Sequence, residues 1–115
     1  MKSFCVTSKH ILIDFYGVQP LKSSQLETLL KYAAKVGKAN VLSFFSHPFE
    51  GGGETAVAVL SESHITVHTW PEHNFAAFDI FMCGNADPEA AANWLRQNIT
   101  SEVADTKILV RGSNC

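Results

Sequence analysis

Alternation of apolar and polar residues is the clearest pattern along this chain, and it predicts a protein rich in β-strand. Side chains of a strand point alternately to its two faces, so a period of two indicates extended backbone. The pattern predicts strands over residues 9–17, 41–45, 55–60 and 74–82, a strand through 63–70 that Pro71 should end, and a short last strand over 107–110. Residues 47–53, which include three consecutive glycines, indicate a turn or a close approach of two backbones.

Two other segments repeat their apolar residues with the period of an α-helix. The first covers residues 24–36 and has its apolar positions at Leu26, Leu29, Leu30 and Ala33. Ser24 and Glu27 have the form of a capping box, and Gly37 should end this helix. The second covers residues 88–98, with Asp87 as its capping residue and Pro88 in its first turn.

The order of these elements predicts the fold class. Strands and helices alternate in a way that favours an α+β protein, a two-layer α/β sandwich whose antiparallel-rich sheet carries two helices on one face. Both parities of residues 74–82 are largely apolar, so we expect that strand to be covered on both sides. No repeat or linker divides the chain, which predicts a single domain over residues 1–115.

Composition and charge exclude several classes of function. Hydrophobic residues make up 46% of the chain and charged residues 17%, an ordinary globular balance. The net charge of -2 argues against non-specific nucleic-acid binding, and no basic run suggests contact with a membrane. We find no signal peptide and no apolar run of transmembrane length, so we expect a cytoplasmic protein.

Three cysteines are too few and too widely spaced for a disulfide framework or a C-x-x-C metal site. This favours a reducing compartment. The sequence assigns no role to six cysteine and histidine residues: Cys5, Cys115, His10, His47, His64 and His73.

Candidate chemistry is concentrated in residues 60–72, which read LSESHITVHTWPE. The residues that share one parity of this predicted strand are His64, Thr66, His68 and Trp70. An ordinary half-buried strand alternates apolar residues with unreactive polar ones. Reactive side chains packed this closely on a strand are a local inconsistency that is typical of functional sites.

Three kinds of chemistry compete for this stretch. A metal ion would need His64 and His68 to converge, but on a strand they stand about 13 Å apart at ~3.3 Å per residue, so we expect no metal. A serine hydrolase would need a G-x-S-x-G elbow, which is absent. In the third, Ser63 attacks the carbonyl of Glu62, and elimination from the ester cleaves the chain and leaves a pyruvoyl group, an electrophile for amines. The spacing of these residues alone does not establish this third, self-cleaving chemistry.

Residues 60–72, together with AAFDIFMCG at 76–84, resemble the short prokaryotic S-adenosylmethionine decarboxylase proenzymes. The signature of that family reads approximately S-E-S-H-x-x-x-H-T-W-P-E, followed by A-x-x-D-x-F-x-C-G. A looser resemblance covers the whole chain. The family fold is an α/β sandwich that pairs as a homodimer, with active sites that take residues from both protomers.

The resemblance implies that the chain cleaves itself between Glu62 and Ser63. Residues 1–62 would become a β chain, and residues 63–115 an α chain whose Ser63 is converted to a covalent pyruvoyl cofactor (pyruvate). This group would form a Schiff base with S-adenosylmethionine and release CO₂. The decarboxylated product would supply spermidine synthesis.

The resemblance also assigns roles to other residues. His68 matches the residue that assists processing, with Thr55 in support, and Cys83 matches the acid that protonates the substrate after CO₂ leaves. The residues that match substrate contacts are Phe49, Trp70 and Glu72, the last through the ribose hydroxyls.

One segment departs from the family pattern. Gly53-Glu54-Thr55 stands where a G-V-S-G-like sequence is common, so Thr55 replaces a serine and Glu54 puts an unusual charge nearby. Processing could therefore be slower. Two alternatives stay open: a pyruvoyl-dependent decarboxylase of ornithine or arginine, or an unprocessed regulatory subunit without catalysis.

Overall fold

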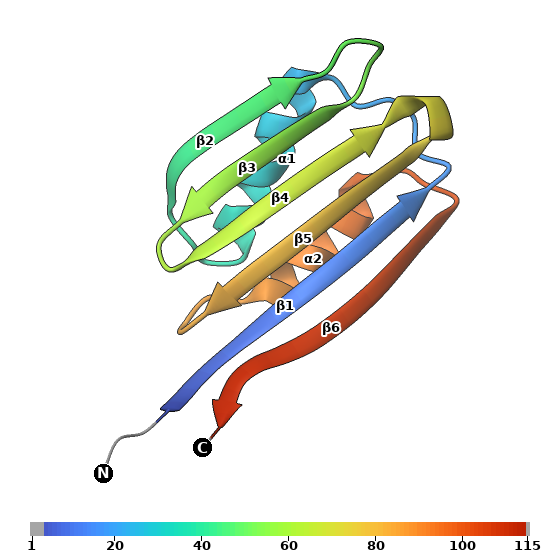
Figure 1. Cartoon of the computed structure of the whole chain (residues 1–115). Helices are drawn as coiled ribbons and strands as arrows, with labels where there is room; N and C mark the ends of the chain where they lie inside the picture. The colour runs from blue at the N-terminus through green and yellow to red at the C-terminus, as the bar shows by residue number, and fades with distance from the viewer. Residues whose placement is uncertain (1–3, 115) are drawn as a thin grey trace.

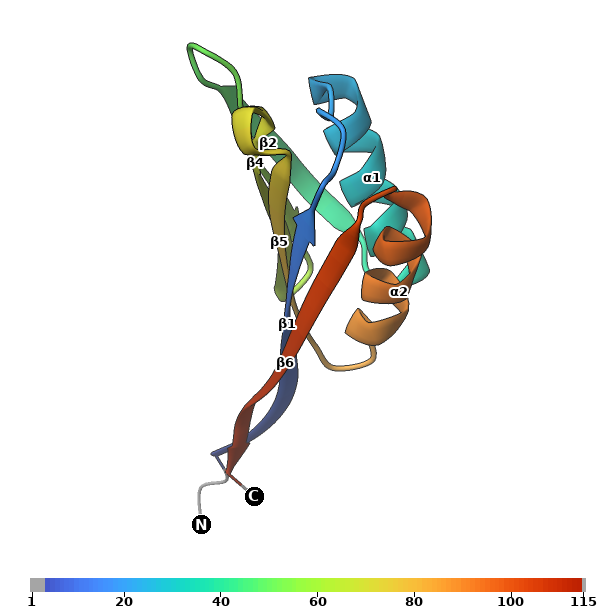
Figure 2. The same cartoon turned by 90° about the vertical axis from the view of Figure 1, so that its right-hand side faces the viewer.

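Residues 4–114, which the computed structural model describes, form one open sheet of six antiparallel strands with both helices on a single face (Figure 1, Figure 2). In chain order the elements are β1 (Phe4–Tyr16), α1 (Ser23–Val36), β2 (Val41–Pro48), β3 (Glu54–Leu60), β4 (Ser63–Trp70), the 3₁₀ helix η1 (Pro71–His73), β5 (Phe75–Cys83), α2 (Pro88–Asn98) and β6 (Val103–Asn114). Across the sheet the strand order is β2-β3-β4-β5-β1-β6. The predicted α+β two-layer sandwich is confirmed.

Both helices bury one apolar face against the sheet. Their buried residues follow the helical spacing and are Leu26, Leu30, Ala33 and Ala34 in α1, and Pro88, Ala91, Ala92 and Leu95 in α2. Asp87 caps α2 as predicted, since its side chain accepts a hydrogen bond from the Ala90 N–H at 3.0 Å. Within the described part of the chain, neither helix is long and apolar enough to cross a bilayer.

The start of α1 differs from the prediction. The helix begins one residue before Ser24, so Gln25 holds the third position, and its side chain accepts the Lys22 N–H at 2.8 Å. Glu27 lies in the next turn and pairs with Lys31 at 2.5 Å. The predicted capping box of Ser24 and Glu27 is wrong, because the helix begins after Lys22, and Gln25, two residues before Glu27, accepts the N–H of its capping residue.

Three strands are longer than the sequence predicts. β1 begins at Phe4, β2 continues to Pro48, and β6 extends well beyond residues 107–110 on both sides. β6 is an edge strand that pairs only with β1. Polar residues such as Asp105 and Arg111 lie on either side of the predicted segment, and backbone pairing continues through them because it does not depend on side-chain polarity.

The two faces of the sheet differ in burial. Toward the helices, Ile11, Ile65 and Ile80 are completely buried and belong to the core. On the other face, β5 presents residues that are only half-buried, such as Phe81. The prediction that residues 74–82 are covered on both sides is wrong for the single chain, because both described helices lie over the same face (Figure 2).

We call the uncovered side of the sheet the open face. On the four inner strands its residues are Thr55, Val57 and Val59 of β3; His64, Thr66, His68 and Trp70 of β4; Phe75, Ala77, Asp79, Phe81 and Cys83 of β5; and His10, Leu12, Asp14 and Tyr16 of β1. Every reactive side chain of β4 except Ser63 therefore lies on a surface that the helices leave free.

Candidate active site

The predicted cleavage site lies in the two-residue turn that joins β3 to β4. Leu60 and Ser63 pair across this hairpin, and Ser61 and Glu62 form the turn between them. Glu62 has a φ of +62°, a left-handed conformation that costs a residue with a side chain about 1–2 kcal/mol. The peptide bond between Glu62 and Ser63 therefore belongs to a strained backbone, as is common at reactive sites.

Two reactive side chains lie next to this peptide bond. Cys83, the last residue of β5, donates a hydrogen bond from Sγ to the carbonyl oxygen of Glu62 over 3.2 Å. The Ser63 hydroxyl is buried and has no hydrogen-bond partner among residues 4–114. Such an unpaired hydroxyl costs about 1–3 kcal/mol. The thiol polarises the carbonyl, and the neighbouring hydroxyl is not engaged elsewhere, so no other hydrogen bond competes with an attack of Ser63 on Glu62.

The other predicted processing residues lie at the opposite end of β4. Thr55 and His68 are cross-strand neighbours on the open face, and Thr55 Oγ1 lies 2.9 Å from His68 Nδ1. A hydrogen bond at one ring nitrogen fixes the orientation and tautomer with which the other nitrogen acts. The hydroxyl of Thr55 thus reaches His68 despite its additional methyl group.

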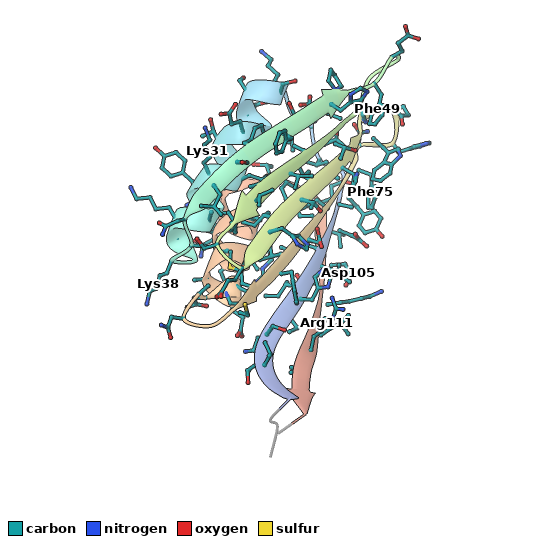
Figure 3. The ribbon with its side chains drawn as sticks, turned by 60° about the vertical axis from the view of Figure 1, so that its left-hand side comes forward. Lys31, Lys38, Phe49, Phe75, Asp105 and Arg111 are labelled. Carbon is teal, nitrogen blue, oxygen red and sulfur yellow. The ribbon has the colours of Figure 1, made fainter. Side chains whose placement is uncertain are left out.

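A cavity of about 330 Å³ brings the predicted substrate contacts together at this end. Its lining includes five predicted residues: Phe49, Thr55, His68, Trp70 and Glu72. Trp70 packs on Phe75 with ring centroids 5.4 Å apart, and Figure 3 shows Phe49 and Phe75 at the same end of the sheet. The cavity combines aromatic faces with the carboxylate of Glu72.

The glycines between β2 and β3 shape a wall of this cavity. Gly53 has a φ of +89°, and a Cβ at this position would stand 2.8 Å from the carbonyl oxygen of Thr69. Only glycine allows β3 and β4 to approach this closely here. The interpretation of residues 47–53 as a close backbone approach is therefore confirmed for Gly53, although His47 and Pro48 belong to β2.

Glu54 lies on the helix side of the sheet, on the opposite face from Thr55. It is 6% exposed and accepts a hydrogen bond from the Ser23 hydroxyl in the first turn of α1. That turn has no acidic residue of its own, and a carboxylate near a helix amino terminus is stabilised by the helix dipole. The expectation that Glu54 places a charge beside the processing residues is wrong, because strand alternation turns it away from them.

The predicted residues therefore form two groups. We call Glu62, Ser63 and Cys83 the cleavage end, and we call the cavity residues Phe49, Thr55, His68, Trp70 and Glu72 the cavity end. Ser63 and His68 are separated along β4 by about 16 Å at ~3.3 Å per residue. Within one chain, His68 cannot reach the peptide bond of Ser63.

Sequence reasoning missed a hydrogen-bonded cluster on the open face between these two ends. Asp79 accepts hydrogen bonds from Thr66 Oγ1, from His10 Nε2 at 2.6 Å and from His64 Nε2 at 3.2 Å. Burial opposes ionisation of Asp79, but these hydrogen bonds and the charge of His64 outweigh it and hold its pKa below the ordinary value of 3.8. The available signal was a carboxylate within the apolar strand at 74–82, where a half-buried charge needs partners.

Two imidazoles and one carboxylate also have the composition of a transition-metal site, and these donor atoms lie within 4.8 Å of one another. Both Nε2 atoms are directed at the same oxygen, Asp79 Oδ2, at hydrogen-bonding distance. Hydrogen bonds donated by His10 and His64 account for this convergence without an ion.

The fold suggests no chemical role for the remaining unassigned residues. His47 packs on Phe49 with ring centroids 5.0 Å apart, and His73 ends η1. Cys115 and the side chain of Cys5 lie outside the described part of the chain.

Comparison with known proteins identifies the family. The family model of S-adenosylmethionine decarboxylase matches residues 9–112, which is nearly the whole chain. This chain is a member of the S-adenosylmethionine decarboxylase family. Curated relatives include the S-adenosylmethionine decarboxylase proenzyme of Pyrobaculum aerophilum, 42% identical over 95 residues (78% of this chain, 76% of the relative). Another is the proenzyme of Sulfurihydrogenibium sp., 39% identical over 107 residues (90% and 80%).

A solved structure of the S-adenosylmethionine decarboxylase family has the same fold. The crystal structure of the adenosylmethionine decarboxylase from Aquifex aeolicus superimposes with a TM-score of 0.81 at 30% sequence identity, covering 91% of this chain and 90% of that one. The family resemblance inferred from the motifs at residues 60–84 is confirmed.

Proposed function

We propose that this chain is a self-processing, pyruvoyl-dependent decarboxylase of S-adenosylmethionine. The observation that carries the proposal is the geometry of the cleavage end, where a strained Glu62 carbonyl is polarised by Cys83 beside the unpaired hydroxyl of Ser63. A merely structural turn has no need of a buried hydroxyl without a partner. Membership of a family whose relatives are named proenzymes supports the same reading.

The cleavage follows from ordinary acyl-transfer chemistry. Ser63 Oγ attacks the Glu62 carbonyl carbon, the Cys83 thiol donates to the developing oxyanion, and the peptide bond is exchanged for an ester. His68 then removes the proton from Cα of Ser63, the Cβ–O bond breaks, and the Glu62 carboxylate leaves. Water converts the resulting dehydroalanine to the pyruvoyl group with release of ammonia.

The pyruvoyl group supplies an electrophilic carbonyl that takes up the amino group of the substrate and accepts the electrons left by CO₂. The chain's own residues bind and orient the substrate. Aromatic faces of Phe49 and Trp70 suit a sulfonium cation, and the Glu72 carboxylate suits a pair of ribose hydroxyls. Cys83 stands at the cleavage end as the group that returns a proton to the substrate.

A second copy of the chain completes each site in this proposal. The separation of Ser63 from His68 along β4 requires a His68 from elsewhere. Exposed apolar side chains of the open face, such as Phe45 and Leu109, suit a contact between copies. A two-fold axis in the plane of that contact and running across the strands sets the cleavage end of each copy against the cavity end of the other.

The first test is an intact mass of the purified protein under denaturing conditions. We expect two fragments, residues 1–62 and a pyruvoyl-blocked 63–115, and we expect Ser63→Ala to abolish them. The substrate is tested by CO₂ release from S-adenosylmethionine, ornithine and arginine. A single species of 12.6 kDa after long incubation would contradict the self-processing proposal. Release of CO₂ from ornithine or arginine, but not from S-adenosylmethionine, would contradict the proposed substrate.

A further inference from the structure

Cleavage at Ser63 converts the start of β4 from the middle of a hairpin into a chain terminus. Before cleavage, Ser61 and Glu62 tie the first residue of β4 covalently to β3. Afterwards this tie is lost, and ends of strands fray more readily than their centres. The reactive group would therefore sit at a free end, and side-chain contacts near that end must help to hold it.

His64 makes the contact that is best placed to do this. It is the residue that follows Ser63, and its Nε2 lies 3.2 Å from Asp79 Oδ2 on the neighbouring strand β5. Its ring also packs against Phe81, with centroids 5.7 Å apart. No other side chain lies nearer in sequence to the proposed pyruvoyl group on β4.

Asp79 is itself held firmly, so it can serve as an anchor. Thr66 donates to one carboxylate oxygen, and His10 and His64 donate to the other. The three donors come from two strands, β1 and β4, on either side of β5. With donors on both sides and only a fifth of its side chain exposed, the carboxylate has little freedom to rotate.

We propose that Asp79 and His64 are positioning residues that anchor the cleaved amino terminus of the α chain through their hydrogen bond. The proposal rests on the self-processing function described above. Neither residue needs to touch the reacting atoms. A displacement of about 1 Å at a reacting group can cost on the order of a hundredfold in rate, so a modest anchor at residue 64 has a large effect on catalysis.

The anchor predicts a specific kinetic signature. In the proposed site the substrate contacts are Phe49, Trp70 and Glu72 of the second copy. His64 and Asp79 are not among them, so loss of the anchor leaves substrate binding nearly unchanged. A misplaced electrophile slows the chemical step. We therefore expect a fall in kcat with little change in KM.

The test compares His64→Gln with His64→Leu in the full-length protein. The Gln side chain places an N–H near the position of the imidazole Nε2 and keeps a donor to Asp79, whereas Leu has a similar volume and no donor. We expect His64→Gln to retain kcat per cleaved chain within about twofold and His64→Leu to lose about tenfold, since one hydrogen bond contributes roughly 0.5–1.5 kcal/mol. His10→Leu removes another donor to Asp79 and leaves the His64 contact intact, so it should lose less, within about threefold.

Each outcome bears on the proposal. A tenfold difference in kcat per cleaved chain between the two variants supports the anchor. Failure of His64→Leu to cleave while His64→Gln cleaves would overturn it, because the intact hairpin still ties Ser63 to β3 at that step. Equal behaviour of the two variants, whether both active or both impaired, would overturn it. Wild-type protein that never cleaves would instead contradict the self-processing function, and mass analysis of the wild type separates that failure from failure of the anchor.

Discussion

At the scale of single residues, hydrogen bonds decide which departures from the family pattern matter. Thr55 replaces the family serine and still lies 2.9 Å from His68 Nδ1, whereas its neighbour Glu54 faces the helices. Alternation along β3 therefore separates a substitution that touches the processing histidine from one that supports α1. Residue identity alone did not distinguish the two, because both positions belong to the same unusual segment.

Self-cleavage should require the hydroxyl group of Thr55 but not its methyl group. We expect Thr55→Ser to self-cleave within about twofold of the wild-type rate and Thr55→Val to cleave about tenfold more slowly, because Val keeps the shape and leaves His68 Nδ1 without its partner. Cleavage is followed by intact mass against time. Equal rates for Val and Ser at this position would show that the hydrogen bond has no part in processing.

At the scale of elements, the hydrophobic pattern predicted most of the fold for a clear physical reason. Both helices and the inner strands bury one face, so their apolar residues recur with the period of a helix or a strand. The full length of the edge strand β6 was not predicted, because backbone hydrogen bonds rather than apolar side chains pair it with β1. The start of α1 was misplaced because Gln25 can accept a hydrogen bond at the helix start as well as Glu27 would. Coverage of β5 was misjudged because its open face carries apolar residues that no element within residues 4–114 covers.

The turn between β2 and β3 depends on one glycine more than on its neighbours. Gly53→Ala should reduce the free energy of unfolding by at least about 1 kcal/mol more than Gly51→Ala. Both residues have positive φ, but a Cβ at Gly53 meets the Thr69 carbonyl oxygen at 2.8 Å, whereas a Cβ at Gly51 meets nothing within 4 Å. Urea unfolding of the two variants measures the difference, and equal destabilisation would contradict the proposed close approach.

At the scale of the whole molecule, the proposed function assigns complementary halves of one chemistry to the two ends of β4. The family resemblance assigns roles to the side chains there, and the fold separates them into a cleavage end and a cavity end. Spacing along the chain could not reveal this division, because it depends on strand register and on which face each residue occupies. Likewise the Asp79 cluster joins the consecutive strands β4 and β5 to β1, which is distant in sequence.

The central claim is that one copy supplies Ser63 and another supplies His68. The most direct test is to co-express Ser63→Ala and His68→Ala chains that carry different tags, isolate the mixed dimers and weigh their fragments. Each variant alone should stay intact. In a mixed dimer, one site combines the intact Ser63 of the His68 variant with the intact His68 of its partner.

The account predicts that the His68→Ala chain is cleaved in those mixed dimers and that the Ser63→Ala chain is not. The mass of the α fragment identifies which chain was cut, because only one carries the His68 substitution. Mixed dimers in which both chains remain whole would contradict the account, since processing would then require both residues in the same chain.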